Sequence, residues 1–269
     1  MKLTVITVCR NNLQGLERTY NSVACQTARS EFEWIIIDGD STDGTKEWLA
    51  AHDSEIDRWI SEPDTGIYNA MNKGVRLASG DYCLFINSGD YLFSLNAIAD
   101  ASKFLDNTTD FIYTDLDVYT PQKKRHNLWI YPDKLSAVYL KRGSLPHPST
   151  LIRSNLLKND PYNEKNKIVS DWEFFYRQIV LKNATYKKIS GTISTFVLDG
   201  ISSDYGNAIR QQLIVYGQIT PNILKEAIDE SETFQVLPLK NFNIFLLKSK
   251  IFTLKTLSKI KKFLFRRFA

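Results

Sequence analysis

Short apolar runs alternate with amphipathic stretches along residues 1–90. Runs rich in β-branched residues predict buried strands, and apolar residues three or four positions apart predict helices. The predicted strands span residues 3–8, 34–37, 58–61 and 82–86, and the predicted helices span 15–26 and 66–78, with another starting within 41–45. This alternation is typical of a mostly parallel sheet covered by helices. The sequence therefore predicts an α/β fold.

The pattern changes after Asp110. A further strand is predicted over 111–114, an amphipathic helix over 171–181 and a strand over 184–189. Residues 117–148 contain four prolines and are predicted to be irregular. A loop over 199–204 and a long helical C-terminus complete the chain.

Charge is distributed unevenly, although the net charge is only +4. Residues 233–269 contain nine Lys or Arg and no Asp or Glu, which leaves 25 basic and 30 acidic residues in the rest of the chain. An acidic body argues against a general nucleic-acid binder, so no nucleic-acid partner is expected. The basic tail is expected to face an anionic surface.

The basic tail has an amphipathic pattern when it is placed on a helix. One side carries Lys255, Lys259, Lys262 and Arg266, and the other carries Leu254, Leu257, Ile260, Leu264 and Phe268. This pattern is typical of a segment lying in a membrane interface, so peripheral membrane contact through 250–268 is predicted. The alternative is a helix packed on the protein body or on a second copy in a homodimer.

The three cysteines have neither the spacing of a disulfide framework nor that of a zinc site. They are predicted to be reduced thiols, as in cytosolic proteins. We expect no signal peptide, because the first strand begins almost at the N-terminus. No stretch of about 20 residues is free of charge, so no membrane span is expected.

Polar residues gather where the predicted parallel strands end. Thr7, Arg10 and Asn11 mark the end of the first strand, Asp38 and Asp40 the second, and Asn87 to Asp90 the fourth. Ligands of such sheets bind at the carboxyl ends of the strands. These clusters are therefore expected to lie together in one site.

Several motifs together resemble those of family 2 glycosyltransferases, which have the GT-A fold. The matching stretches, spread over residues 2–200, are TVITVCRNN, IIIDGDSTDGT, SEPDTGIYNAMNKGVRLASGDYCLFINSGD, PHPSTLIRSNLL and SDWEFF. The resemblance implies a Rossmann-like, mostly parallel sheet flanked by helices, with a C-terminal helical extension. It divides the chain into a nucleotide-sugar-binding half (1–115), an acceptor-binding half of the same domain (116–205) and a basic amphipathic extension (206–269).

The resemblance assigns nucleotide contacts to the ends of the first three strands. Thr7, Arg10 and Asn11 are expected at the base and ribose, and Asp38 is expected to accept a base N–H group. Similar enzymes often carry two adjacent acids here, whereas this chain has Gly39 second and Asp40 third. The alternative for Asp38 is a turn aspartate.

The third strand is followed by further candidates. Asp64 is expected to face the base and Lys73 to neutralise phosphate. The alternatives are a capping role for Asp64 and a solvated surface position for Lys73.

The metal motif of the family corresponds to Asn87-Ser88-Gly89-Asp90. A divalent ion stabilises the charge that develops on a departing nucleoside diphosphate, and Mn²⁺ or Mg²⁺ prefers oxygen ligands. Asp90 is the expected ligand, with Asn87 and Ser88 at the substrate. Some versions of this motif carry more acidic residues. In this chain Asn87 and Gly89 stand in their place, which leaves one carboxylate. A capping role for Asp90 is the alternative.

Catalysis by inversion needs a carboxylate that takes the acceptor proton. Asp171, within Ser170-Asp171-Trp172-Glu173, matches the family's general base, and Glu173 is expected to point elsewhere on the helix. A first-turn or N-cap acid is the alternative for Asp171. His147 is expected near the sugar or acceptor entrance or, alternatively, in a structural hydrogen bond. The loop around 200–203 resembles one that closes over the diphosphate.

These expectations describe an inverting transferase dependent on Mn²⁺ or Mg²⁺. It would move a hexose or N-acetylhexosamine from a UDP-sugar to a saccharide acceptor, carried on a polyprenyl diphosphate, for a bacterial surface polysaccharide. Its expected location is the cytoplasm, on the inner face of the membrane. The alternatives are a non-catalytic nucleotide-sugar-binding or scaffold protein and a nucleotidyltransferase. A nucleotidyltransferase would need a Gly-rich phosphate loop, and residues 9–12 do not form one.

Overall fold

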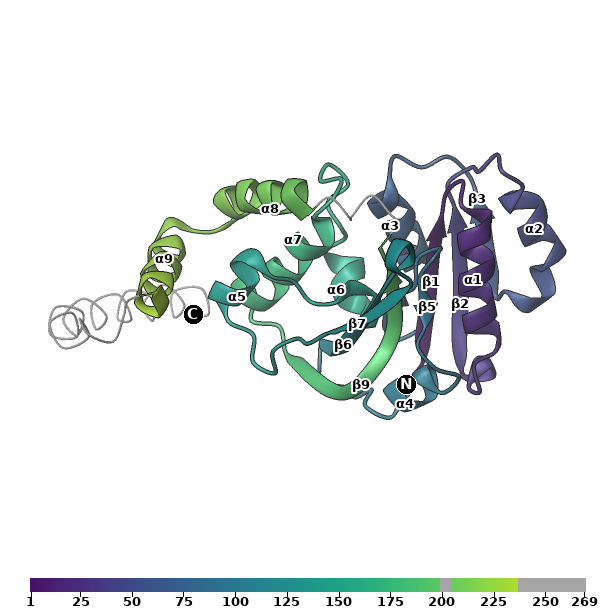
Figure 1. Ribbon diagram of the computed structural model, residues 1–269, viewed down its shortest axis with the longest axis horizontal. Helices are drawn as coiled ribbons and strands as arrows, with labels where there is room; N and C mark the ends of the chain where they lie inside the picture. Colours follow the sequence, from purple (N-terminus) through teal and green to yellow (C-terminus); the bar gives the residue numbers. More distant parts are fainter. Residues whose placement is uncertain (199–204, 237–269) are drawn as a thin grey trace, which may run out of the picture.

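The computed structural model describes residues 1–198 and 205–236. Strands and helices alternate through its first third, as the sequence predicts (Figure 1). These elements are β1 (Leu3–Cys9), α1 (Leu13–Ala24), η1 (Arg29–Glu31), β2 (Phe32–Asp38), α2 (Thr45–Ala51), η2 (Asp53–Glu55), β3 (Arg58–Ser61), α3 (Ile67–Leu77) and β4 (Tyr82–Phe85). The predicted strands and helices of this region are confirmed.

The second part of the described chain is more regular than predicted. It contains β5 (Tyr91–Leu92), α4 (Ala97–Ser102), β6 (Phe111–Thr120), η3 (Pro121–Lys123), β7 (Arg125–Trp129), α5 (Ala137–Arg142), η4 (His147–Ser149), β8 (Thr150–Arg153), α6 (Ser154–Asn159), α7 (Ser170–Tyr176), η5 (Arg177–Leu181), β9 (Tyr186–Val197), α8 (Tyr205–Ile219) and α9 (Asn222–Val236). The prediction that 117–148 is irregular was wrong, because this region contains the β6–β7 hairpin and α5.

The described residues form one nine-stranded mixed sheet. Its order is β3-β2-β1-β4-β8-β6-β9-β5, and β7 pairs with β6. Neighbours among β3, β2, β1 and β4 are parallel, whereas β8 is antiparallel to both β4 and β6. β6 crosses residue 115, so the two predicted halves share this sheet.

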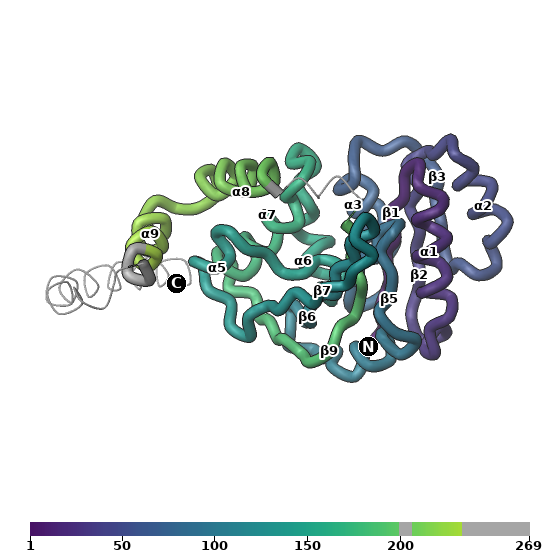
Figure 2. Tube along the Cα trace, viewed as in Figure 1, coloured from purple at the N-terminus to yellow at the C-terminus, as the bar shows by residue number. Residues whose placement is uncertain are grey.

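Two apolar layers cover the sheet. Ile6, Ile35 and Ile37 belong to the layer that also contains α3 and α7, while Val5 and Trp34 belong to the layer with α1 and α2 on the other side. This division follows from the alternation of side chains along β1 and β2. Figure 2 shows α1 and α2 at one end of the molecule, and α8 and α9 at the other.

The three cysteines are free thiols, in agreement with the prediction. Among the described residues, no helix has the length and apolar character required to cross a bilayer. The loop around 200–203 and the basic segment 250–268 lie outside the described residues.

Candidate functional site

The carboxyl ends of β1, β2, β3 and β4 meet at one edge of the sheet. Cys9 pairs with Asp38, and Asp38 pairs with Ser61, so these three strands end side by side. β4 runs parallel to β1 on its other side. The segments that follow these strands, which carry most of the predicted site residues, therefore lie at the same edge.

Asp38 holds the ends of β2 and β3 together. Its carboxylate is fully buried and accepts hydrogen bonds from the Ser41 amide (3.1 Å), the Ser41 hydroxyl and the Ser61 hydroxyl (2.7 Å). The Ser41 hydroxyl also accepts a hydrogen bond from the backbone N–H group of Asn11 at 2.7 Å. Asp38 therefore shapes the turn that presents its exposed neighbours, and its contact with a base stays a prediction.

Thr7 and Asn11 occupy different environments. Thr7 is fully buried, and its hydroxyl accepts a hydrogen bond from the Trp34 indole at 3.0 Å, below the sheet edge. Asn11 is exposed at the edge and accepts a hydrogen bond from the Thr42 amide at 2.9 Å. Asn11 has a backbone φ of 47°, which a polar turn residue tolerates. Of the two, only Asn11 is placed where a ligand can reach it.

Asp64 closes over Gly39. A Cβ atom added to Gly39 would lie 2.2 Å from Asp64 Oδ2, so a side chain there would displace the Asp64 carboxylate. Arg10 Nη1 lies 3.7 Å from Asp64 Oδ1, with the Asp64 side chain 4% exposed and the Arg10 side chain 60% exposed. The Gly66 amide donates to Asp64 Oδ1 at 2.8 Å. Asp64 thus occupies the space into which a side chain at position 39 would extend.

We predict that Gly39→Ala weakens UDP binding by about tenfold, because one displaced hydrogen-bonding group costs about 1–2 kcal/mol. Gly39 does not have a positive φ, so the added methyl group acts through Asp64 and not through backbone strain. Isothermal titration calorimetry with UDP measures the change. Gly217→Ala in α8 is the control, because nothing lies within 4 Å of its added Cβ. Unchanged UDP affinity in Gly39→Ala would contradict the assignment of Asp64.

Asp40 and Lys73 stay predictions as ligand contacts. Asp40 is exposed with a φ of 59°. Lys73 Nζ lies 2.8 Å from a Glu62 carboxylate oxygen and donates to the Pro63 carbonyl at 2.8 Å. Lys73 therefore already stabilises the segment that carries Asp64.

The turn Asn87–Asp90 is anchored by two residues of the α1 region that the sequence reasoning missed. Asn12 Nδ2 donates to the Ser88 carbonyl and hydroxyl, both at 3.1 Å. The Thr19 hydroxyl contacts the carbonyls of Asn87 (3.2 Å) and Asp90 (2.7 Å) and accepts from the Gly89 amide (3.0 Å). Gly89 has a φ of 107°, a conformation that favours glycine. The sequence offers only a weak signal for these contacts, a polar N-cap and a threonine about two turns beyond it.

Oxygen donors of this turn suit a hard divalent cation. Asp90 is buried, and its Oδ1 accepts from the Val197 amide at 2.9 Å. Asn87 Oδ1 is buried and has no hydrogen-bond partner among the described residues. An unsatisfied buried oxygen in the same turn as a carboxylate fits Mn²⁺ or Mg²⁺ when a diphosphate supplies further ligands. The described residues contain no cluster of three or more His, Cys, Asp or Glu placed to bind a metal alone.

Asp171 lies in the first turn of α7 and is not its N-cap, which is Val169. The Tyr68 hydroxyl donates to Asp171 Oδ1 at 2.8 Å. Glu173 contacts a different set of residues, because its carboxylate accepts from Asn163 and Asn166, each at 3.1 Å. The two acids of α7 therefore have separate surroundings, as the spacing predicts.

His147 lies between the surroundings of Asp171 and the end of β4. It is buried, stacks on Phe85 at 4.8 Å between ring centroids, and places Nε2 2.8 Å from the Tyr162 hydroxyl. Burial lowers its pKa, and the charge of Asp171 opposes that shift. Phe85 directly precedes Ile86-Asn87. The environment of Asp171 thus adjoins the strand that leads to Asn87 and Asp90.

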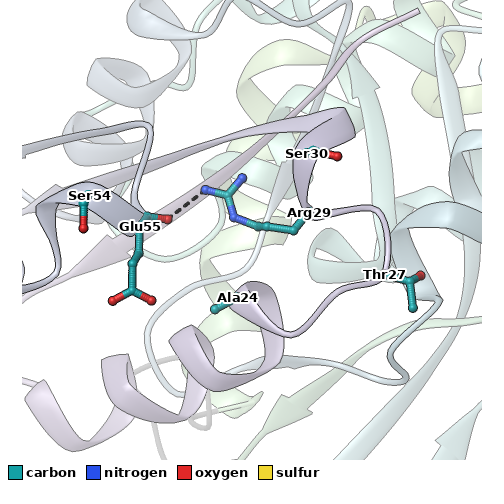
Figure 3. A pocket seen from close by; sticks show the side chains of 6 residues that line it. All are labelled: Ala24, Thr27, Arg29, Ser30, Ser54 and Glu55. Atoms are coloured by element: carbon teal, nitrogen blue, oxygen red, sulfur yellow. Dashed lines mark hydrogen bonds between the residues drawn. The ribbon is translucent and has the colours of Figure 1, made fainter.

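A separate surface pocket lies away from these residues. Figure 3 shows its lining residues, which are Ala24, Thr27, Arg29, Ser30, Ser54 and Glu55. They come from the end of α1 and from the segments preceding β2 and β3, so the pocket is at the opposite edge of the sheet. The Arg29 guanidinium donates to the Glu55 carbonyl across it at 2.9 Å. None of the predicted site residues lines this pocket.

Several known proteins are similar in sequence. An uncharacterized glycosyltransferase of Mycobacterium tuberculosis is 41% identical over 103 residues, covering 38% of this chain and 39% of its own length. A PGL/p-HBAD biosynthesis glycosyltransferase of Mycobacterium bovis is 30% identical over 163 residues, covering 58% of this chain and 61% of its own length. The similarity thus spans less than two thirds of these curated relatives.

Solved structures of glycosyltransferases share the fold. Staphylococcus aureus TarS 1–349 in complex with UDP superposes with a TM-score of 0.63 at 19% identity, covering 91% of this chain and 78% of that one. The mannosyltransferase PcManGT from Pyrobaculum calidifontis, in complex with GDP-Man and Mn²⁺, gives 0.56 at 13% identity, covering 93% and 79%. The expected GT-A fold is confirmed.

The sequence profile of the family described as glycosyl transferase family 2 matches residues 4–183. This range includes every predicted site residue from Thr7 to Asp171. It covers the strands that end at the candidate site and the helix that carries Asp171. The chain therefore belongs to glycosyl transferase family 2.

Proposed function

We propose that this protein is a metal-dependent, inverting glycosyltransferase that moves a hexose or N-acetylhexosamine from a UDP-sugar to a saccharide acceptor. One observation carries the proposal. The Tyr68 hydroxyl holds the Asp171 carboxylate. Asp171 lies near His147, and His147 stacks on Phe85, which belongs to the strand that leads to Asn87 and Asp90. This arrangement supports Asp171 as the base and the oxygen-rich turn as the metal site.

The donor is assigned to the first four strand ends. Arg10 and Asn11 would contact the nucleoside because both are exposed at the edge, and Asp64 would do so from its place beside Arg10, 3.7 Å from the guanidinium. Asp90 and Asn87 would hold the divalent ion, which when bound offsets the charge developing on the leaving diphosphate. TarS, a protein of the same fold, forms complexes with UDP and with UDP-GlcNAc. These complexes favour UDP as the nucleotide.

Transfer needs only one protein group that exchanges a proton. The acceptor hydroxyl oxygen forms a bond to the anomeric carbon while the bond from that carbon to the phosphate oxygen breaks. The electron pair leaves with the nucleoside diphosphate, and Asp171 takes the acceptor proton. A single displacement inverts the anomeric configuration and requires no protein nucleophile.

The acceptor is assigned by chemical class. Similar proteins are glycosyltransferases of PGL/p-HBAD biosynthesis and a poly(ribitol-phosphate) β-N-acetylglucosaminyltransferase, all bacterial. A saccharide on a polyprenyl diphosphate, reached at the inner membrane face through the basic segment 250–268, fits this setting and the charge of that segment.

The test is UDP release by the purified full chain across a panel of UDP-sugars, with Mn²⁺ or with EDTA. We expect one sugar to be hydrolysed slowly in the presence of Mn²⁺ and not in EDTA. Because hydrolysis without an acceptor is slow, calorimetry with the same panel accompanies it. If no UDP-sugar is hydrolysed or bound, the UDP-sugar assignment fails. Binding to a donor without turnover on any saccharide acceptor would favour the non-catalytic alternative.

A further inference from the structure

We propose that Tyr68 is a positioning residue for the reaction, because its hydroxyl orients the Asp171 carboxylate. This inference rests on the proposed function, in which Asp171 takes the acceptor proton. Tyr68 is the second residue of α3 and is separated from Asp171 by 103 positions in the sequence. No local pattern indicates the contact between them.

The Tyr68 hydroxyl is fixed at the start of α7. Its O–H group is placed to donate to both Asp171 Oδ1 and the Ile168 carbonyl, each at 2.8 Å. The residue is 6% exposed, and its ring lies 5.6 Å from that of Tyr162. The hydroxyl therefore contacts both the backbone of Ile168 and the carboxylate of Asp171.

Tyr68 can act only as a hydrogen-bond donor toward this carboxylate. Burial, with the adjacent Asp171 charge, raises the pKa of Tyr68 well above its ordinary value, so the phenol keeps its proton. A donor at Oδ1 stabilises the ionised carboxylate. Oδ2 has no hydrogen-bond partner among the described residues, so it is the oxygen available to the acceptor proton.

The other titratable groups facing Asp171 do not replace this contact. They are His147 on η4 and Tyr162 in the segment before α7. Burial lowers the pKa of His147 and raises that of Tyr162 well above its ordinary value, so both are neutral near pH 7. Their direct hydrogen bond joins them to each other at 2.8 Å. Tyr68 is thus the described side chain that donates to Asp171.

The same short segment serves both substrates. Asp64, which covers Gly39 on the donor side, and Tyr68, which holds Asp171, lie four residues apart. Lys167 Nζ donates to the Thr65 carbonyl at 2.6 Å, and Glu164 accepts from Asn69 Nδ2 at 2.9 Å. The loop preceding Asp171 is therefore tied to the start of α3, and the position of the base depends on the segment that contacts the donor.

The test is Tyr68→Phe in the full chain, which removes one hydroxyl and keeps the ring. We expect kcat to fall about tenfold to hundredfold, since a hydrogen bond to a charged group is lost. KM for the UDP-sugar should stay within about twofold, because that bond is not made to the donor. The acid limb of the pH–kcat/KM profile should move up by about one pH unit, because the carboxylate protonates more readily without its donor.

Tyr113→Phe is the matched control, because it removes another buried hydroxyl, whose partner is the Pro132 carbonyl at 2.6 Å. It should leave both kcat and the acid limb unchanged. A second measurement does not require turnover: ¹³C NMR titration of the Asp171 carboxyl, assigned by comparison with Asp171→Asn. Its midpoint should rise by about one pH unit in Tyr68→Phe.

The outcomes separate the two proposals. An unchanged NMR midpoint and acid limb in Tyr68→Phe would overturn the role of Tyr68, whatever the wild-type activity. A higher midpoint in a protein that turns over no donor would support the contact and reject the proposed function. A lower kcat accompanied by weaker donor binding and an unmoved midpoint would assign Tyr68 a structural role only.

Discussion

Asp171→Asn is expected to lower turnover by about 10²–10⁴-fold, the contribution typical of a general base. Asparagine has nearly the same size as aspartate, and its Oδ1 can still accept the Tyr68 hydroxyl at the present position. The variant should therefore fold as the wild type does and bind UDP equally well. Steady-state kinetics with the donor identified from the panel, together with calorimetry for UDP, separates the loss of proton transfer from a loss of binding.

Glu173→Gln provides the matched control, since it neutralises the other acid of the same helical turn. Glu173 is buried and holds Asn163 and Asn166, so its replacement should act on the loop before α7 and leave a functional base. We expect a lower melting temperature and a loss of turnover of less than about tenfold. If Asp171→Asn retains turnover and Glu173→Gln loses it, the general base has been assigned to the wrong residue.

The first half of the fold was predictable because its signals are local. Strands such as β1 and β2 are continuous apolar runs, as expected where both faces of a parallel sheet are covered. β6 was underestimated because Asp115 and Asp117 interrupt its apolar pattern. Their partners, Lys188 at 2.8 Å and His126 at 2.6 Å, lie on other segments, so the sequence could not show that these acids fit a strand.

The candidate site divides in the same way. The location of Arg10, Asp64 and Asp90 after the ends of strands could be predicted, because a parallel sheet brings strand ends to one edge, while their roles stay predictions. Thr7 belongs to the strand itself, and its hydroxyl is directed to Trp34. Tyr68 and Thr19 could not be found from the sequence, because each acts through a contact with a residue more than 60 positions away.

Asp90→Asn is expected to remove most Mn²⁺-dependent UDP binding and to lower UDP release by about 10²-fold, as loss of a charge-stabilising group does. The Oδ1 atom of the new asparagine can still accept the hydrogen bond from the backbone N–H group of Val197, so the turn should keep its shape. Calorimetry with UDP in Mn²⁺ and in EDTA measures the metal-dependent part of the affinity. Asp100→Asn is the control, because Asp100 is an exposed acid that pairs with Lys103 at 2.7 Å. Equal metal dependence in Asp90→Asn and wild type would exclude Asp90 as a ligand.

The reverse change, Asn87→Asp, tests the same assignment from the opposite direction. The buried Asn87 Oδ1 has no partner among the described residues, and a carboxylate there would add a second negative charge to the turn that carries Asp90. In EDTA this charge should lower the melting temperature, because burying an unpaired charge is unfavourable. With Mn²⁺ and UDP the melting temperature should recover, and the metal-dependent affinity should exceed that of the wild type, because hard cations bind carboxylates more strongly than amides. A destabilisation that Mn²⁺ and UDP do not reverse would mean that Asn87 Oδ1 faces no metal.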